Sequence, residues 1–406
     1  MNRNTNTLFD NSLWKSKLSI YEKIVAVSFA FSIPHAKALT FGIILTIPLL
    51  FTGDRPKIKL VNNFLLICII AVMNGILLTA VYYSSSYNRV DIFNIGAHMI
   101  NYSLLLLALS RFSSIDMLIE FIVWRYVGSI IFANPYVGQG FSAYWKYVLG
   151  IPITVVLLHL CRRNLRLTYL IAVGLLYFSV HEGFRSLGLT LLGSFLIFWF
   201  SVDSAKVNFR KRKVMSTVIG TLSLLAISGL FISFATSGNR AGANSLQIGS
   251  IEVGRIEFFS GVQFMMHHAL GFGLGALPSP DVIYSAETYL VNAGFHADNT
   301  YMLNFLLSGN IKFHSFILDA WSSFGIFGLF AGIFALISGI RGIFQVFRVR
   351  TFGPLIAFIL LQGLWDLLFS PFISNGQSVI CMISIGIYLQ NHKTQFPDQD
   401  RRREIC

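Results

Sequence analysis

Charged residues are scarce in this sequence. Only 12% of its 406 residues are Asp, Glu, Lys or Arg, whereas 54% are hydrophobic. Because soluble proteins carry about 25% charged residues, this chain has too few charges to cover a water-facing surface. The shortage excludes a soluble globular protein of ordinary composition and indicates that the chain lies in a lipid bilayer.

Cysteine is also scarce. The four cysteines, Cys68, Cys161, Cys381 and Cys406, form no C-x-x-C pair, and the first three lie in or beside apolar runs. Disulfide frameworks and zinc sites need cysteines or histidines at short, regular spacings. The sequence therefore predicts neither, and we expect no bound metal and no cofactor.

Acidic residues are fewer than basic ones, with 18 Asp and Glu against 31 Lys and Arg, which gives a net charge of +13. In a soluble protein this excess would suggest a nucleic-acid partner. In a membrane protein, basic residues concentrate on the cytoplasmic side, so the positions of the charges are more informative than their sum. We therefore expect contact with membrane lipids and no nucleic-acid partner.

Apolar runs recur along the whole sequence. A helix needs about 20 apolar residues to cross the hydrocarbon core of a bilayer. Runs near this length predict an all-α polytopic membrane protein with about twelve transmembrane helices, in one integral membrane domain over residues 1–406. Pro34, His35 and Lys37 interrupt the first two, where a re-entrant pair is the alternative. We place the spans near 20–35, 37–53, 61–81, 95–112, 115–133, 146–161, 167–181, 186–202, 215–235, 315–340, 354–370 and 374–390.

These spans divide the basic residues unequally between the two sides of the membrane. With the N-terminus inside, 23 of the 31 Lys and Arg residues lie on the inner side and seven on the outer side, while Arg125 lies within the fifth span. Because positive loops resist translocation, the bias predicts a multi-pass protein with both termini in the cytoplasm. A flexible cytoplasmic tail is expected over 391–406.

One long external loop is predicted over residues 236–314, between the ninth and tenth spans. Its apolar pieces, such as Phe258 to Met266, alternate with turn residues and predict short amphipathic helices on the membrane surface, folded as a lid. Glycines 271, 273 and 275 form a G-x-G-x-G pattern. No strand precedes them, so a nucleotide-binding site is not predicted.

Arginines on the outer side oppose the general bias and therefore indicate function. Arg185 lies in a short connection between two apolar helices, and Arg240 and Arg255 lie in the external loop. Arg125 is costly to bury within a span. It either serves a function there, or it reaches the interface or pairs loosely with Glu120.

Histidines gather in and around the external loop. For His181, His267 and His296, hydrogen bonding at the membrane interface is the simpler interpretation. Their spacing does not suit metal binding, because the sequence has no H-E-x-x-H motif. His314 differs in standing at the junction between the loop and the next predicted helix.

Several of these segments together are similar to one family. They are the long external loop, Gly254-Arg255, His268 followed by Leu270-Gly271-Phe272-Gly273, the stretch from His314 to Asp319 followed by Gly325-Ile326-Phe327-Gly328, and Gly183-Phe184-Arg185-Ser186 at the head of a membrane helix. The chain resembles the bacterial O-antigen polymerase and O-antigen ligase superfamily. It departs from the family pattern at Ala269, where proline is common, and at Phe259, where ligases often have leucine.

The resemblance implies an inverting, metal-independent glycosyltransferase in the bacterial inner (cytoplasmic) membrane. The donor would be a glycan linked to undecaprenyl diphosphate, and the acceptor another glycan or a lipid-linked sugar. Arg185 and Arg255 are expected to stabilise the diphosphate leaving group, and His314 to act as base or to orient the acceptor. Arg125, His268 and Arg240 are expected to bind substrate, with Arg125 near the carrier phosphate.

Three alternatives remain open from the sequence. A ligase would transfer the glycan to lipid A-core, whereas the favoured polymerase joins repeat units of O-antigen or another surface polysaccharide. A flippase or transporter of lipid-linked oligosaccharides would need ionisable residues near the midplane of several helices and two comparable halves. The few candidates for that role are Arg125, Glu120, Asp319 and Asp366. A structural assembly subunit would leave the outer Arg and His residues without a reason.

Overall fold

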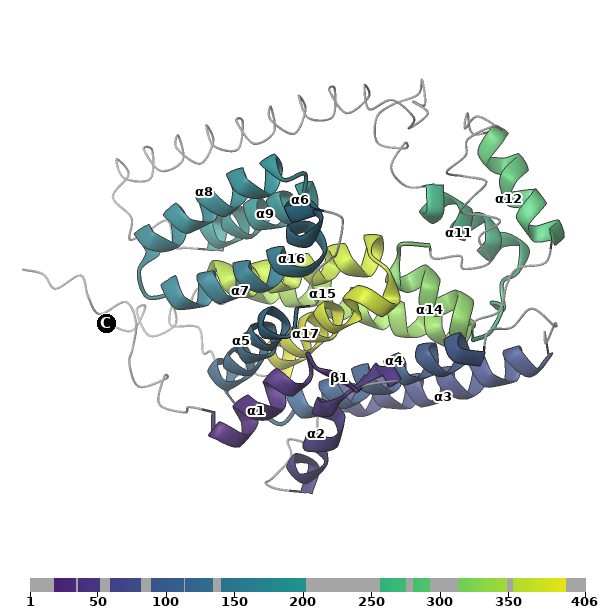
Figure 1. Ribbon diagram of the computed structural model, residues 1–406, viewed down its shortest axis with the longest axis horizontal. Helices are drawn as coiled ribbons and strands as arrows, with labels where there is room; N and C mark the ends of the chain where they lie inside the picture. Colours follow the sequence, from purple (N-terminus) through teal and green to yellow (C-terminus); the bar gives the residue numbers. More distant parts are fainter. Residues whose placement is uncertain are drawn as a thin grey trace, which may run out of the picture.

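The computed structural model describes residues 18–33, 36–51, 59–81, 89–112, 114–133, 140–201, 256–274, 280–292, 313–348 and 353–391. Helices make up nearly all of these residues (Figure 1). The predicted ninth span near 215–235, most of the external loop and the tail beyond Asn391 lie outside the described residues. Within the described part, the fold is helical apart from one short hairpin, as expected for an all-α membrane protein.

The N-terminal region forms two short helices instead of two long spans. Helix α1 (Ile20–Ser28) has nine residues and α2 (Phe41–Phe51) has eleven, and the antiparallel strands β1 (Ser32–Ile33) and β2 (Ala36–Thr40) lie between them. Eleven residues of helix are about 16 Å long, roughly half the thickness of the hydrocarbon core. The two continuous spans expected at 20–35 and 37–53 are thus replaced by a helix–hairpin–helix unit, which divides the apolar run where Pro34 and Lys37 interrupt it.

The other described helices follow in chain order. They are α3 (Lys59–Val81), α4 (Arg89–Leu109), α5 (Ile115–Ile131), α6 (Gly140–Tyr144), the π-helical turn η2 (Trp145–Leu149), α7 (Gly150–Cys161), α8 (Leu165–His181), α9 (Arg185–Ser201), α11 (Ile256–His267), α12 (Pro280–Asn292), α14 (Phe316–Phe324), α15 (Ile326–Arg348), α16 (Pro354–Phe369) and α17 (Phe372–Asn391).

Five described helical stretches are long and apolar enough to cross a membrane: Lys59–Val81, Ile92–Leu109, Gly140–Cys161, Ile326–Val346 and Phe372–Asn391. The third joins α6, η2 and α7 into one stretch. Shorter apolar helices of 10–17 residues are present within α8, α9 and α16. These helices support a membrane-embedded protein, whereas the number of about twelve spans stays a prediction.

The predicted tenth span, 315–340, is broken into α14 and α15. Gly325 lies between them with φ 67° and ψ −150°, a backbone conformation that residues other than glycine rarely adopt. A Cβ atom at this position would lie 2.5 Å from both Asn74 Nδ2 and the carbonyl oxygen of Leu270. The sequence pattern missed this break because its apolar residues continue through the glycine.

Helix α17 forms the centre of the bundle. Its residues from Ser378 to Leu389 are buried, and it contacts α4, α5, α14, α15 and α16. Helix α3 instead turns Leu66, Ile69 and Met73 outward, each more than half exposed. A helix that is apolar on every side is stable only in a protein interior or in lipid. The position of α17 fits the first environment, and that of α3 fits the second.

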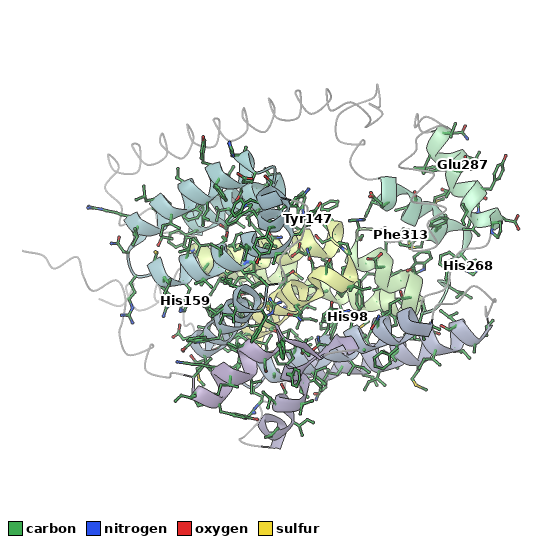
Figure 2. The ribbon with its side chains drawn as sticks, in the orientation of Figure 1. His98, Tyr147, His159, His268, Glu287 and Phe313 are labelled. Atoms are coloured by element: carbon green, nitrogen blue, oxygen red, sulfur yellow. The ribbon has the colours of Figure 1, made fainter. Side chains whose placement is uncertain are left out.

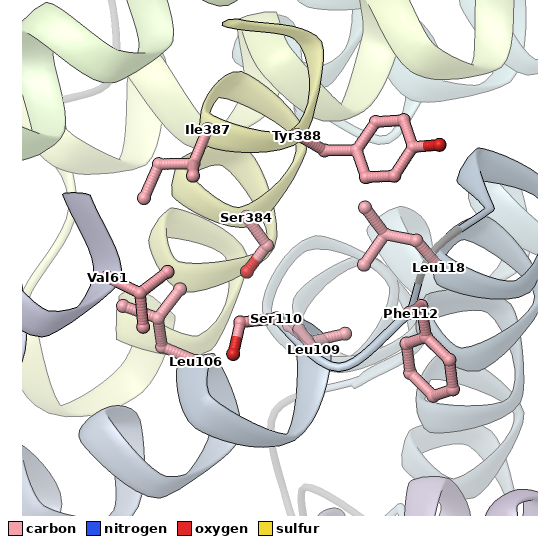
Figure 3. Close-up of a pocket in the computed structure, with 9 residues that line it drawn as sticks. All are labelled: Val61, Leu106, Leu109, Ser110, Phe112, Leu118, Ser384, Ile387 and Tyr388. Atoms are coloured by element: carbon pink, nitrogen blue, oxygen red, sulfur yellow. The ribbon is translucent and has the colours of Figure 1, made fainter. Parts of the chain in front are cut away.

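The helices alternate in direction, and this brings many of the described basic residues to one end. The start of α3, the end of α4, the start of α5 and the end of α17 line one small pocket, through Val61, Leu109, Leu118 and Tyr388 (Figure 3). We call this the basic end, because the same helix ends and their neighbours carry Lys23, Lys59, Arg111, Arg162, Arg163 and Arg166. At the opposite end, α3 ends against the end of α14, and the start of α17 lies beside the start of α14. We call this the lid end.

Candidate functional site

Residues 256–274 and 280–292, here called the lid, carry α11 and α12 beside α14 (Figure 1). Phe264 and Phe272 of the lid pack edge-to-face, with ring centroids 6.2 Å apart. Phe313, which precedes α14, and Trp321 within α14 belong to the same cluster, and Figure 2 shows Phe313 and His268 at the same side of the molecule. The lid and α14 therefore share one apolar cluster, which is separate from the main core of the bundle.

A short segment after α11 fixes the lid to the bundle. The amides of Phe272 and Gly273 both donate to the carbonyl of Ser322, at 2.8 and 3.0 Å, and Leu274 N–H donates to the Thr79 hydroxyl at 2.8 Å. Gly271 and Gly273 have φ angles of +83° and +105°, and a Cβ on Gly271 would lie 2.5 Å from the Trp321 carbonyl oxygen. Gly271 and Gly273 therefore allow close backbone packing of the lid on α14 and α3, whereas Gly275 lies outside the described residues.

His268 lies in this segment. Its Nδ1 is 3.0 Å from the carbonyl oxygen of Gly271, and its ring lies 4.8 Å from that of Phe272. These contacts stabilise the turn, and its expected role in binding substrate stays a prediction. The neighbouring His267 is exposed and lies 2.8 Å from Gln263 on the same helix.

His314 occupies a turn with an unusual backbone. Its φ is 49°, and it is the one residue other than glycine with positive φ in the described part of the chain. Phe313 before it and Ser315 after it are buried, whereas the His314 side chain is 45% exposed. Left-handed backbone at a residue with a side chain is costly, so surrounding contacts must hold it.

Asp319 supplies that restraint. Its Oδ1 accepts the backbone N–H of Phe313 at 2.8 Å, and its Oδ2 accepts the backbone N–H of Phe372, the first residue of α17, at 2.9 Å. Hydrogen bonds to a carboxylate are stronger than those between neutral groups. One side chain therefore ties the His314 turn to the central helix of the bundle.

Glu257 faces His314 from the first turn of α11. The distance from its Oε1 to His314 Nε2 is 3.9 Å, and its side chain is only 8% exposed. Sequence reasoning gave Glu257 no role. The available signal was an acidic residue two positions after Arg255, inside an apolar segment of a chain that has few acidic residues.

The other expected site residues are only partly covered. Arg185 is the first residue of α9, at the lid end, and follows the tight turn at Gly183, where φ is +74°. Arg255 directly precedes α11 but lies outside the described residues, as does Arg240. The structure therefore brings Glu257 and His314 together and leaves the distances from the three arginines to them undefined.

Arg125 points from α5 toward α17. Its Nε donates to Gln377 Oε1 at 2.6 Å, and its guanidinium lies 4.5 Å from the centre of the Tyr126 ring. Gln377 in turn donates to the carbonyl of Phe29 at 3.3 Å. Glu120 instead forms an ion pair with Lys23 at 3.3 Å, so the loose Arg125–Glu120 pair considered from sequence is replaced by a bond to a neutral amide.

The first turns of α17 collect further polar contacts. Asp366 on α16 is buried and accepts hydrogen bonds from Gln362, Ser370, Asn375 and Ser378. Tyr102 on α4 donates to the carbonyls of Phe372 and Ile373, at 2.7 and 2.9 Å. Contacts from α4, α5, α14 and α16 thus meet in residues 370–378, beside the turn that carries His314.

A second group of polar residues lies at the lid ends of α6, α8 and α9. Glu182 accepts a hydrogen bond from Ser142, and its Oε1 is 3.2 Å from His181 Nδ1. The Ser142 hydroxyl and the His181 ring hold the pKa of Glu182 below its ordinary value, because both contacts favour the charged carboxylate. Glu182 lies three residues before Arg185 in the sequence.

The described residues contain no group of three or more His, Cys, Asp or Glu side chains arranged to hold a metal ion. Comparison of the chain with family models, with curated proteins and with solved structures gives no significant match.

Proposed function

We propose that the chain is an inverting, metal-independent membrane glycosyltransferase that takes a glycan from undecaprenyl diphosphate and polymerises the repeat units of a surface polysaccharide. The observation that carries the proposal is the restrained turn of His314 at the junction of lid and bundle, with the buried Glu257 carboxylate beside its imidazole. An imidazole that is held in place and half exposed is suited to accept a proton from a bound hydroxyl.

The reaction balances with one proton acceptor. The acceptor hydroxyl oxygen attacks the anomeric carbon from the face opposite the diphosphate, and its proton passes to the imidazole of His314. The bond from the anomeric carbon to the phosphate oxygen breaks, and the electron pair leaves with undecaprenyl diphosphate. Attack from the opposite face inverts the anomeric configuration, and the exposed imidazole later releases its proton to water.

The leaving diphosphate gains negative charge as this bond breaks. Arg185 heads α9 at the lid end, and Arg255 directly precedes α11, which carries Glu257. Guanidinium groups bind phosphate oxygens through two parallel hydrogen bonds and would stabilise the charge most in the transition state. In this proposal the lid end faces away from the cytoplasm in the bacterial inner membrane, and Arg125, His268 and Arg240 bind the carrier and glycan.

The proposal is tested with the full-length protein reconstituted in liposomes that contain the host bacterium's undecaprenyl-diphosphate-linked repeat unit. We expect longer carrier-linked chains to form in the presence of EDTA, and the His314→Gln variant to lower the rate by about 10²- to 10⁴-fold. The control is His267→Gln, which changes an exposed neighbour on α11 and should keep the rate. Unchanged turnover in His314→Gln, or loss of turnover with EDTA, contradicts the proposal.

A deletion strain distinguishes polymerase from ligase. Loss of a polymerase leaves single repeat units on lipid A-core, whereas loss of a ligase leaves long chains on the carrier. We expect the first pattern.

A further inference from the structure

We propose that Glu257 is a positioning residue for His314: it holds the imidazole as the tautomer with hydrogen on Nε2, so that Nδ1 receives the acceptor's proton. The inference deepens the proposed function and rests on it for the identity of the proton donor. The Glu257–His314 pair itself is defined by the structure and can be tested without any glycan.

The geometry identifies which ring nitrogen faces the carboxylate. His314 Nε2 lies 3.9 Å from Glu257 Oε1. This is longer than a hydrogen bond but close enough for strong attraction between unlike charges. Catalytic hydrogen bonds are often long before substrate binds and shorten in the complex with substrate. A neutral imidazole donates through one nitrogen and accepts through the other, so a donor at Nε2 leaves the lone pair at Nδ1.

The unequal burial of the two groups supports this division of roles. Glu257 is 8% exposed, whereas His314 is 45% exposed. A buried carboxylate needs hydrogen-bond donors or a cation nearby, and the imidazole of His314 provides both when it is protonated. The exposed member of the pair can reach a substrate, and in this proposal the buried member acts through it.

In this proposal two carboxylates restrain different parts of His314. Asp319 restrains the backbone by binding the amide of Phe313, and Glu257 restrains the ring. They lie on different elements, α14 and α11, so the imidazole is set only when the lid is seated on the bundle. A base oriented by a third group is the arrangement that activates nucleophiles in many transferases and hydrolases.

Charge near the imidazole also affects its protonation. A carboxylate within about 4 Å attracts the positive charge that forms when an imidazole accepts a proton. The described acidic and histidine side chains of the lid and of α3, α14, α15, α16 and α17 are Glu257, His267, His268, Asp281, Glu287, Asp319 and Asp366, and α4, which contacts α14 through Tyr102, carries His98. Of these, Glu257 is the one whose ion-pair distance to His314 is within 4 Å.

The test is nuclear magnetic resonance of full-length protein in nanodiscs, with ¹⁵N-labelled histidine and the His314 signals assigned by their loss in His314→Gln. Two quantities are measured: the tautomer of neutral His314, and the midpoint pH at which it takes up a proton. We expect the Nε2–H tautomer in the wild type. Glu257→Gln keeps an acceptor oxygen and removes the charge, so it should lower the midpoint by about one pH unit and keep the tautomer.

Glu257→Leu removes both the charge and the acceptor, and should abolish the tautomer preference. Glu287→Gln on α12 is the matched control and should change neither quantity. An unchanged midpoint in Glu257→Gln overturns the inference. This variant has nearly the shape of the native side chain, so it decides the question even where Glu257→Leu fails to fold.

Transfer assays separate this inference from the proposed function. With an active enzyme, Glu257→Gln should lower kcat and leave KM nearly unchanged, and Glu257→Asp should restore part of the rate. A normal His314 titration response without any transfer activity would leave the pair intact and remove the proposed function. Transfer that needs His314 but is insensitive to Glu257 would remove the positioning role alone.

Discussion

Asp319 on α14 accepts a hydrogen bond from the backbone N–H of Phe372, the residue that begins α17, at 2.9 Å. Its other carboxylate oxygen accepts the N–H of Phe313, immediately before His314. The conformation of the His314 turn therefore depends on the position of α17, which is the most buried of the five described stretches long enough to cross a membrane. A change at the centre of the bundle can in this way reach the lid without touching it.

Replacing Asp319 with Asn tests this connection. An amide has one acceptor oxygen and presents N–H groups where the second backbone N–H needs an acceptor, so one buried donor loses its partner. We expect Asp319→Asn to lower the free energy of unfolding by about 1–3 kcal/mol. Thermal or SDS-induced unfolding of the purified protein measures this change.

The control for this variant is Asp281→Asn, on the exposed face of α12. A surface change of this kind should alter stability by no more than about 0.5 kcal/mol. Equal effects of the two substitutions would show that the bonds from Asp319 do not restrain the turn.

Alanine substitutions at three glycines distinguish the cost of backbone strain from the cost of a steric clash. At Gly271, φ is +83° and an added Cβ would lie 2.5 Å from the Trp321 carbonyl oxygen. At Gly183, φ is +74° but an added Cβ would meet no atom within 4 Å. At Gly174, within α8, the backbone is helical and an added Cβ would also meet no atom within 4 Å. We expect Ala to cost about 3 kcal/mol or more at Gly271, about 1 kcal/mol at Gly183, and to be neutral or stabilising at Gly174. Melting temperatures of the three variants check this order, and a Gly271→Ala protein as stable as Gly174→Ala would contradict the packing described for the lid.

The helical membrane fold could be predicted from composition and from apolar runs, because a bilayer leaves few alternatives for such a chain. The positions where the apolar runs are broken into separate elements could not be predicted. Gly325 is one of 33 glycines, and its effect depends on Asn74 and Leu270, which approach it only in the folded bundle. Pro34, His35 and Lys37 indicate an interruption of the apolar run, but the hairpin that replaces the long helices depends on pairing between β1 and β2.

For a similar reason, some residues of the candidate site could be identified from the sequence and others could not. His314 was marked by its place at the junction of loop and helix, which is a local feature. Glu257 and Gln377 gain their significance from partners 57 and 252 residues away in the sequence, His314 and Arg125, so no local pattern identifies them. Single-sequence reasoning finds residues with unusual chemistry for their location more readily than the neutral or distant groups that hold them.

Arg125 and Gln377 can be tested as an interacting pair. Arg125→Met, Gln377→Met and the double variant form a cycle, with methionine chosen as an unbranched apolar replacement for both. We expect a coupling free energy of about 1 kcal/mol from SDS-induced unfolding in bicelles, in the range measured for hydrogen bonds inside membrane proteins. The control cycle pairs Arg125→Met with Gln390→Met; Gln390 lies 13 residues further along α17, about 20 Å away by helical rise, and should show no coupling. A coupling near zero for the first pair would mean that the hydrogen bond between Arg125 and Gln377 contributes nothing to stability.

The orientation in the membrane is tested by cysteine labelling. In a variant whose four native cysteines are replaced by serine or alanine, one cysteine is introduced at Thr288 on α12, which is exposed at the lid end, or at Arg163 between α7 and α8, which is exposed at the basic end. Because basic residues stay on the cytoplasmic side, a membrane-impermeant maleimide added to spheroplasts should label Thr288→Cys at once and Arg163→Cys only after the membrane is permeabilised. The reverse pattern would place the lid and His314 in the cytoplasm, where a carrier-linked glycan presented at the outer leaflet cannot reach them, and would exclude the proposed reaction.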